Sequence, residues 1–469
     1  MISEVQDALC KSKAKKKLSK LIKKNMWKLY DEKKRINYAD KSIIEKYQLS
    51  KLKVLFTKAY KTPYYKKIID SLGKPINEVV LKDLKKFPIL TKDIIEQQAG
   101  NLIIQNPAVL HRNSIEGPTG GTINIYQDQN YKDHAWASRL IRNELSGWFY
   151  GACCIRLLSK QKDKQYFSKK LDHFWHNTQL YDASPLSENK LNEFHRMMTA
   201  RVPEFIIAHT SSIYLLAAYL NSKGIIPNYP KLSISTTSET LYPYMRKTIE
   251  ETFNVKCFDH YGSREIEEIA GECRKHNGLH VFMDNVIVEC LDPETGEEAY
   301  DRPGKLIITD LNNHGMPFIR YEIGDTCTLT KENCSCGMST PLIKEIFKNS
   351  TANVVLENGN HINGWMLSKA LFPLEGIKSY QFVQETFNSY TLNILKMDCF
   401  NINSLNDPLN KMKKILGETA SIEIKFVEAI PDSSPGHREY IISKINPEAA
   451  GQKKEKTLIS RSTKIITRV

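Results

Sequence analysis

Between residues 205 and 258 the sequence alternates short apolar runs with stretches of helical periodicity, and this alternation restricts the possible folds more than any other feature. The apolar runs at 205–208, 231–235 and 255–258 have the length and composition of buried strands. The intervening segments, 211–223 and 242–253, are predicted as helices. Because a strand–helix–strand order joins parallel strands, we expect a parallel sheet covered by helices.

Changes in the pattern of apolar and polar residues divide the whole chain into three regions. We predict an N-terminal helical segment over residues 1–70, a core with a β-rich subdomain over 71–347, and a small α+β domain over 348–469. In the first region Leu52, Leu55, Phe56 and Ala59 recur at helical spacing. A length of 469 residues is compatible with about two to four domains.

Charge and composition restrict the partners and the compartment. Much of the net charge of +14 lies between residues 11 and 35, where we favour a solvated helix face over a nucleic-acid or membrane contact. No base-stacking pattern accompanies these lysines, so we expect no nucleic-acid partner. The sequence shows neither a signal peptide nor a membrane span, which predicts a cytoplasmic protein without stable membrane insertion. The ten cysteines are then expected to be reduced.

A glycine-rich segment at 114–122 is the first candidate for ligand binding. Its backbone N–H groups could surround phosphate oxygens, although an ordinary surface turn explains the pattern equally well. It lacks the Gly-Lys-Ser/Thr of a Walker-type loop. The residues singled out are Gly117, Thr119, Gly120 and Gly121.

Two further segments follow predicted strands, where open α/β sheets bind their ligands. The first combines an aromatic ring, a glycine and acids: Asp259, His260, Tyr261, Gly262, Ser263 and Glu265. The second, at 317–325, contains Arg320 and ends in a Gly-Asp pair whose Asp325 carboxylate could accept two hydroxyl hydrogens of a ribose.

These three segments, in this order and at these separations, resemble the adenylate-forming superfamily, and in particular its phenylacetate–CoA ligase branch. The resemblance extends from residue 62 to the C-terminus. It implies an α/β fold with a large N-terminal adenylate-forming domain of layered sheets and helices. A small mobile α+β lid domain would follow at the C-terminus.

The resemblance also implies a reaction and residue roles. A small carboxylic acid would attack ATP, and a thiol, usually of coenzyme A, or an amine would then displace AMP. Ser238 and Glu239 would line the adenine, and Tyr261 would stack on it. Glu265 would hold Mg²⁺ and Asp325 would bind the ribose.

The chain departs from the family pattern at three places. Glu116 and Pro118 replace hydroxyl residues of the glycine-rich loop, and residues 348–352 lack the arginine and acids of the hinge. His437 stands where the adenylation lysine is expected, beside Arg438. One hypothesis keeps adenylation, with His437 or Arg438 supplying part of the charge. The other is a non-catalytic or single-half-reaction protein that binds a nucleotide or an acyl-adenylate.

Three cysteines and one histidine form a candidate metal site. Cys273, His280, Cys334 and Cys336 would suit a closed, structural tetrahedral Zn²⁺, and phenylacetate–CoA ligase relatives show a similar arrangement. The alternative is four unrelated side chains, and His276 is a competing ligand.

Two residues are candidates for the acid-binding side. His209, at a strand-to-helix junction, could contact the carboxylate, but a satisfied core histidine is equally compatible. Trp148 could line an acyl pocket, although aromatic clusters more often form core. The sequence leaves the oligomeric state open, a dimer included.

Overall fold

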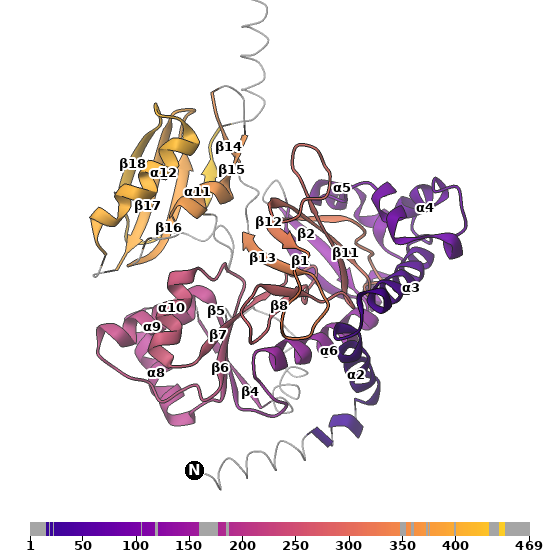
Figure 1. Cartoon of the computed structure of the whole chain (residues 1–469), viewed down its shortest axis with the longest axis horizontal. Helices are drawn as coiled ribbons and strands as arrows, with labels where there is room; N and C mark the ends of the chain where they lie inside the picture. The colour runs from indigo at the N-terminus through magenta and orange to yellow at the C-terminus, as the bar shows by residue number, and fades with distance from the viewer. Residues whose placement is uncertain are drawn as a thin grey trace, which may run out of the picture. The chain divides into compact units, whose positions relative to one another are not determined.

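The computed structural model describes two compact units (Figure 1). The described residues are 16–17, 19–21, 23–104, 106–117, 121–158, 177–183, 187–347, 353–357, 361–371, 374, 376–397, 400–430 and 440–445. The first unit extends to Ile346 and excludes two short segments, Tyr242–Met245 and Gly324–Thr326. These two segments and the chain from Phe347 onward make up the second unit.

An eleven-stranded mixed sheet forms the centre of the first unit, in the order β10-β11-β12-β13-β9-β8-β7-β6-β5-β3-β4. Strands β4, β3, β5, β6 and β7 run parallel, as the strand–helix alternation predicted. From β7 onward the described pairings of β8, β9, β13 and of β10 with β11 are antiparallel. The strand bounds are β3 Cys154–Leu158, β4 Thr178–Asp182, β5 Phe205–His209, β6 Ser233–Thr237, β7 Lys256–Tyr261, β8 Ala270–Glu272, β9 Leu279–Val281, β10 Val286–Leu291, β11 Pro303–Asp310, β12 Tyr321–Thr330 and β13 Leu342–Phe347.

Helices cover both faces of the parallel strands because each strand is apolar on both sides. Helices α8 (Glu188–Arg201), α9 (Thr210–Ser222) and α10 (Pro243–Phe253) lie beside one another near β5 to β7 (Figure 1). Helix α6 (Gln129–Leu145) covers the other face, where its Leu140 and Ile141 share a buried cluster with Ile207 of β5.

The N-terminal part of the chain adds helices to the same unit. Helix α3 places Leu52, Leu55, Phe56 and Ala59 on one fully buried face, as their spacing predicted. Thr62 accepts a hydrogen bond from the backbone of the next helix and caps it, with proline at the first helical position. The bounds are α2 Lys24–Asn37, α3 Lys41–Ala59, α4 Pro63–Asp70, η1 Ile76–Glu78, η2 Leu81–Lys86, α5 Lys92–Leu102 and η3 Pro107–Val109, followed by the hairpin of β1 His111–Glu116 and β2 Thr122–Gln127.

The second unit is a small α+β domain, in agreement with the sequence-based expectation. Its four-stranded sheet has the order β18-β17-β16-β19, with an antiparallel central pair and parallel outer pairs. Helices α11 and α12 pack with this sheet in one apolar core. The bounds are β14 Asn353–Val355, β15 His361–Asn363, α11 Gly364–Leu371, β16 Ile377–Gln384, β17 Ser389–Lys396, η4 Ile402–Leu405, α12 Asn406–Leu416, β18 Ser421–Phe426 and β19 Ile441–Ser443.

The predicted fold class, a large α/β part followed by a small α+β domain, is thus confirmed. Among the described helices, none combines the length and apolar character that crossing a membrane requires.

Candidate functional site

The loop that follows β7 is held in a compact turn that only glycine permits at its first position. A Cβ added at Gly262 would lie 1.9 Å from the carbonyl oxygen of Glu267. The Ser263 amide donates to the Ile266 carbonyl at 2.8 Å, and the Ile266 amide donates back to the Ser263 hydroxyl at 3.1 Å. The Ser263 hydroxyl predicted to face a nucleotide therefore also stabilises its own loop.

The β1–β2 hairpin is fastened to this loop, which brings two of the predicted nucleotide-binding segments together. Asn113 and Gln127 donate to the Arg264 carbonyl at 3.0 and 3.2 Å, and Gln127 also donates to the Glu265 carbonyl at 3.1 Å. The Arg264 guanidinium donates in return to the Ser114 carbonyl at 3.3 Å. The ends of the glycine-rich segment thus lie beside Glu265.

The base of the glycine-rich segment is narrow. The Gly117 amide donates to the Gly121 carbonyl at 2.7 Å, and a Cβ at Gly117 would lie 3.2 Å from Ile123. Thr119 and Gly120 lie outside the described residues, as do Pro118 and the side chain of Glu116. Their predicted contacts with phosphate remain predictions.

Glu265 is the best-placed carboxylate for a hard metal ion. Its side chain is buried, and Tyr321 donates a hydrogen bond of 2.7 Å to its Oε1. This contact orients the carboxylate, whose oxygens are the ligand type that Mg²⁺ requires. The residue therefore fits the predicted Mg²⁺ role. Tyr321 was not predicted as a site residue. Its position within the 317–325 segment was the only signal in the sequence that could have identified it.

A group of ionised side chains adjoins Glu265 and was not predicted from the sequence. Lys132 and Arg139 of α6 contact Glu267 at 3.0 and 2.6 Å, and Arg142 contacts Glu268 at 3.2 Å. Burial disfavours the charged form of Glu268, yet Arg142 and then His260 lower its pKa to about 2. The Glu268 carboxylate stays ionised because its interactions with these neighbours outweigh the cost of burial.

His260 contacts two members of this group. Its Nε2 lies 3.1 Å from Arg142 and 3.3 Å from Glu268, and its Nδ1 lies 3.0 Å from the Thr237 hydroxyl. Asp259 precedes it, and its carboxylate accepts the His260 backbone N–H at 2.8 Å. Both residues are buried, so their predicted contact with a nucleotide stays a prediction.

Glu239 lies at the N-terminus of α9, next to His209. Its two carboxylate oxygens accept the Ser211 amide at 2.6 Å and the Ser211 hydroxyl at 3.0 Å, which suits an anion at a helix start. Burial lowers the pKa of His209, and Glu239 opposes that shift. Ser238, directly after β6, has a φ of +73°. This left-handed conformation ends the extended backbone of the strand.

Three predicted site residues are largely enclosed by the protein. Tyr261 is 1% exposed within an apolar core cluster, and its stacking on adenine stays a prediction. Trp148 is buried in a second apolar cluster, so the structure supports its reading as core. Arg320 makes a bidentate pair with Glu289, both contacts at 3.0 Å, and donates to two backbone carbonyls.

These contacts hold the Arg320 guanidinium against its neighbours in the first unit, and its contact with a nucleotide stays a prediction. Asp325 lies on β12 in the short segment that belongs to the second unit. His437 and Arg438, like the expected hinge at 348–352, lie outside the described residues.

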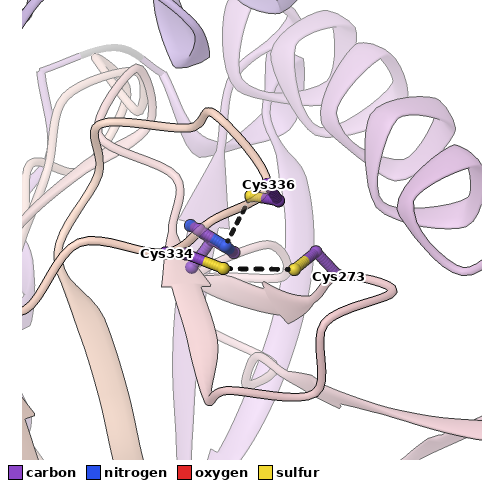
Figure 2. Close-up of side chains that lie close together, drawn as sticks. Cys273, Cys334 and Cys336 are labelled. Carbon is purple, nitrogen blue, oxygen red and sulfur yellow. Dashed lines mark hydrogen bonds between the residues drawn. The ribbon is translucent and has the colours of Figure 1, made fainter.

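The candidate metal ligands come together as the sequence predicted (Figure 2). The donor atoms of Cys273, His280, Cys334 and Cys336 all lie within 4.8 Å of one another. The Cys273 and Cys334 sulfurs are 3.7 Å apart, and the Cys336 sulfur lies 3.3 Å from His280 Nε2. A tetrahedral zinc with ordinary bond lengths has edges of about 3.8 Å between sulfurs and about 3.6 Å between sulfur and nitrogen.

The surroundings of the four donors also suit zinc. His280 Nδ1 lies 3.0 Å from the Thr340 hydroxyl, which leaves Nε2 directed at the sulfurs. Burial lowers the pKa of His280 to about 4, so its ring is neutral, as a ligand must be. His276 instead contacts Glu272 at 3.1 Å and is not part of the group. Binding of zinc itself remains a prediction.

Gly278 allows the first half of the candidate metal site to approach the second. Its φ is +110°, and an added Cβ would lie 2.8 Å from the Ile343 carbonyl oxygen on β13. Strand β13 pairs with β9, where Ile343 lies opposite Leu279 and Leu342 opposite His280. The glycine therefore admits the strand pairing that sets the position of His280.

Comparison with known proteins gives consistent results. Residues 354–444 match the family model of the CapK C-terminal domain. Protein CapK of Staphylococcus aureus is 22% identical over 395 residues, covering 81% of this chain and 85% of that protein. Phenylacetate-coenzyme A ligase of Thermus thermophilus is 33% identical over 140 residues, 29% of this chain and 32% of that protein.

The fold is also that of a solved ligase. A crystal structure of 2-hydroxyisobutyryl-CoA ligase in its postadenylation state superposes with a TM-score of 0.70. The match has 15% identity and covers 90% of this chain and 94% of that one. The chain thus has the fold of an acyl-CoA ligase structure, and its sequence is similar to that of CapK and, over part of its length, to that of a phenylacetate-coenzyme A ligase.

Proposed function

We propose that this protein activates a carboxylic acid with ATP, forming an acyl-adenylate and pyrophosphate. The acyl group then passes to a thiol such as that of coenzyme A, or to an amine. The observation that supports adenylation best is the set of hydrogen bonds that joins the β1–β2 hairpin, which carries the glycine-rich segment, to the loop of Glu265. The Glu265 loop follows β7 at the end of the parallel strands, the usual ligand position in an open α/β sheet, and the hairpin is hydrogen-bonded to that loop.

The chemical task is to bring two anions together, the carboxylate and the triphosphate. Backbone N–H groups of the glycine-rich segment would bind phosphate oxygens, because its glycines allow close approach. Mg²⁺, held by Glu265, would offset phosphate charge when bound. The hydrogen bond from Tyr321 keeps the Glu265 carboxylate oriented, so this carboxylate would not have to reorganise when Mg²⁺ binds.

The acid would approach from the side of His209. This residue ends β5, and Glu239 and the start of α9 fix its surroundings. Since burial lowers the pKa of His209, its ring is neutral near pH 7 and can donate one hydrogen bond to a carboxylate oxygen. The lid residues His437 and Arg438 remain candidates for the charge that the family's lysine supplies.

The experiment is pyrophosphate release from ATP and Mg²⁺ across a panel of carboxylic acids, followed by hydroxylamine trapping of any acyl-adenylate. We expect turnover with at least one acid, and Glu265→Gln should lower kcat at least 100-fold while ATP still binds. Glu294→Gln is the matched control, because Glu294 is an exposed carboxylate in the turn between β10 and β11.

Two results would argue against the proposal. If ATP binds normally but no acid supports pyrophosphate release, the chain is better described as a nucleotide- or acyl-adenylate-binding homologue. The changed residues at 116 and 118 would then mark a lost half-reaction. If Glu265→Gln retains full activity, the Mg²⁺ role assigned to this carboxylate is wrong.

A further inference from the structure

Four basic side chains lie close together on the α6-covered face of the sheet. Lys132, Arg139 and Arg142 extend from α6, and Arg156 lies on β3. Among the described residues, Glu267 and Glu268 contact this group, and both pair with the α6 side chains.

The strand register places Arg156 next to the proposed acid-binding residues. Arg156 lies opposite Ile207 of β5, and His209, two residues later, lies opposite Thr237 of β6. Because side chains alternate along a strand, these residues share one face of the sheet. Arg156 also lowers the pKa of His209, which shows that the two groups influence each other.

Arg156 differs from the other three cations because no carboxylate pairs with it among the described residues. Its Nε is buried without a hydrogen-bond partner in that part of the chain. The Arg156 side chain as a whole is partly exposed. Burial of its inner atoms lowers the pKa of Arg156 to about 10, Arg139 adds to that effect, and Glu267 partly opposes it. A guanidinium in such surroundings is costly unless an anion compensates for it.

We propose that Arg156 binds a second anionic group of the acid, so that the preferred substrates carry an anion besides the reacting carboxylate. This inference rests on the proposed function and specifies its substrate class. The planar guanidinium can hold a carboxylate through two parallel hydrogen bonds. A neutral hydrocarbon tail would leave the guanidinium uncompensated, and a site that contains an unpaired charge discriminates strongly between such substrates.

The first experiment compares matched acids: succinate with butyrate, glutarate with valerate, and terephthalate with 4-methylbenzoate. Pyrophosphate release is measured for the unchanged protein, Arg156→Met and Arg156→Lys. We expect the dicarboxylic member of a pair to have the higher kcat/KM. Arg156→Met should lower that value at least 10-fold and leave the KM for ATP unchanged, whereas Arg156→Lys should retain part of it.

Arg196→Met is the matched control, since Arg196 is exposed on α8, away from β3. Melting curves establish that the variants fold. A phosphonate analogue of each diacid shows whether the second anion must be a carboxylate or can be a phosphate-like group. Equal turnover of mono- and dicarboxylic acids, unaffected by Arg156→Met, would overturn the inference and leave adenylation standing.

Failure of the proposed function would be recognised separately. If no acid supports turnover, the same acid pairs are tested by calorimetry with ATP and Mg²⁺ present. Binding of diacids that Arg156→Met abolishes would sustain the inference without catalysis. Absence of diacid binding would refute the inference, because the guanidinium would then bind no second anion. A loss of ATP binding in Arg156→Met would also refute it, because Arg156 would then contact the nucleotide.

Discussion

Removal of the predicted zinc gives the most direct test of the structure. The four donor atoms lie within 4.8 Å of one another, and two of their separations are near those of a tetrahedral zinc site, 3.7 Å between the Cys273 and Cys334 sulfurs and 3.3 Å between the Cys336 sulfur and His280 Nε2. We expect the purified protein to contain one zinc per chain. Because the donors come from two segments more than fifty residues apart, loss of the ion should loosen the junction of β9 and β13.

The expected size of the effect follows from linkage. A ligand present at about 1,000 times its Kd stabilises the folded state by about 4 kcal/mol. The first unit has about 340 residues, for which the unfolding entropy is about 0.7 kcal/mol per degree. Stripping the metal should therefore lower the Tm of this unit by about 6 °C.

The assay is elemental analysis together with melting curves before and after treatment with a chelator. Cys336→Ser should abolish both the zinc content and the chelator effect. Cys153→Ser is the control, since Cys153 is also partly exposed but lies outside the donor group. Protein purified without chelator that contains no zinc, or a Tm indifferent to both chelator and Cys336→Ser, would refute the assignment.

Three further predictions concern stability. Gly262→Ala should destabilise the first unit by about 3 kcal/mol or more, since its Cβ would overlap the Glu267 carbonyl, and urea unfolding measures this. Arg320→Met should cost about 3–5 kcal/mol in the same assay, because it leaves the Glu289 carboxylate buried and unpaired. Burial lowers the pKa of His134 to about 2, so its contribution is complete above about pH 6.5 and declines as the pH falls. That decline is at most about 1.4 kcal/mol per pH unit, and His134→Gln should remove it.

Matched substitutions provide the controls. Gly100→Ala, inside helix α5, introduces a Cβ that meets nothing within 4 Å, and it should raise stability by at most about 1 kcal/mol rather than lower it. His111→Gln, at a partly exposed histidine, should preserve the acid sensitivity that His134→Gln removes. A tolerated Gly262→Ala, a neutral Arg320→Met or an unaltered pH profile in His134→Gln would each contradict the contact on which that prediction depends.

Local pattern was enough to predict much of the architecture. The alternation between residues 205 and 258 predicted the parallel strands, since the period of apolar residues reports burial within a short window. The spacing of Cys273 to His280 and of Cys334 to Cys336 predicted a four-donor group, which the structure brings together. The sequence also singled out Gly262, where the structure shows that an added Cβ would overlap the Glu267 carbonyl.

Tertiary structure alone decided which polar side chains meet. The pairing of Tyr321 with Glu265, of Arg320 with Glu289 and of α6 cations with Glu267 joins residues far apart in the chain. Such contacts depend on which sheet face a side chain occupies and on which helix covers it. That is why the sequence by itself determined the fold class and the candidate motifs, whereas packing decided the burial of Trp148 and the position of Arg156.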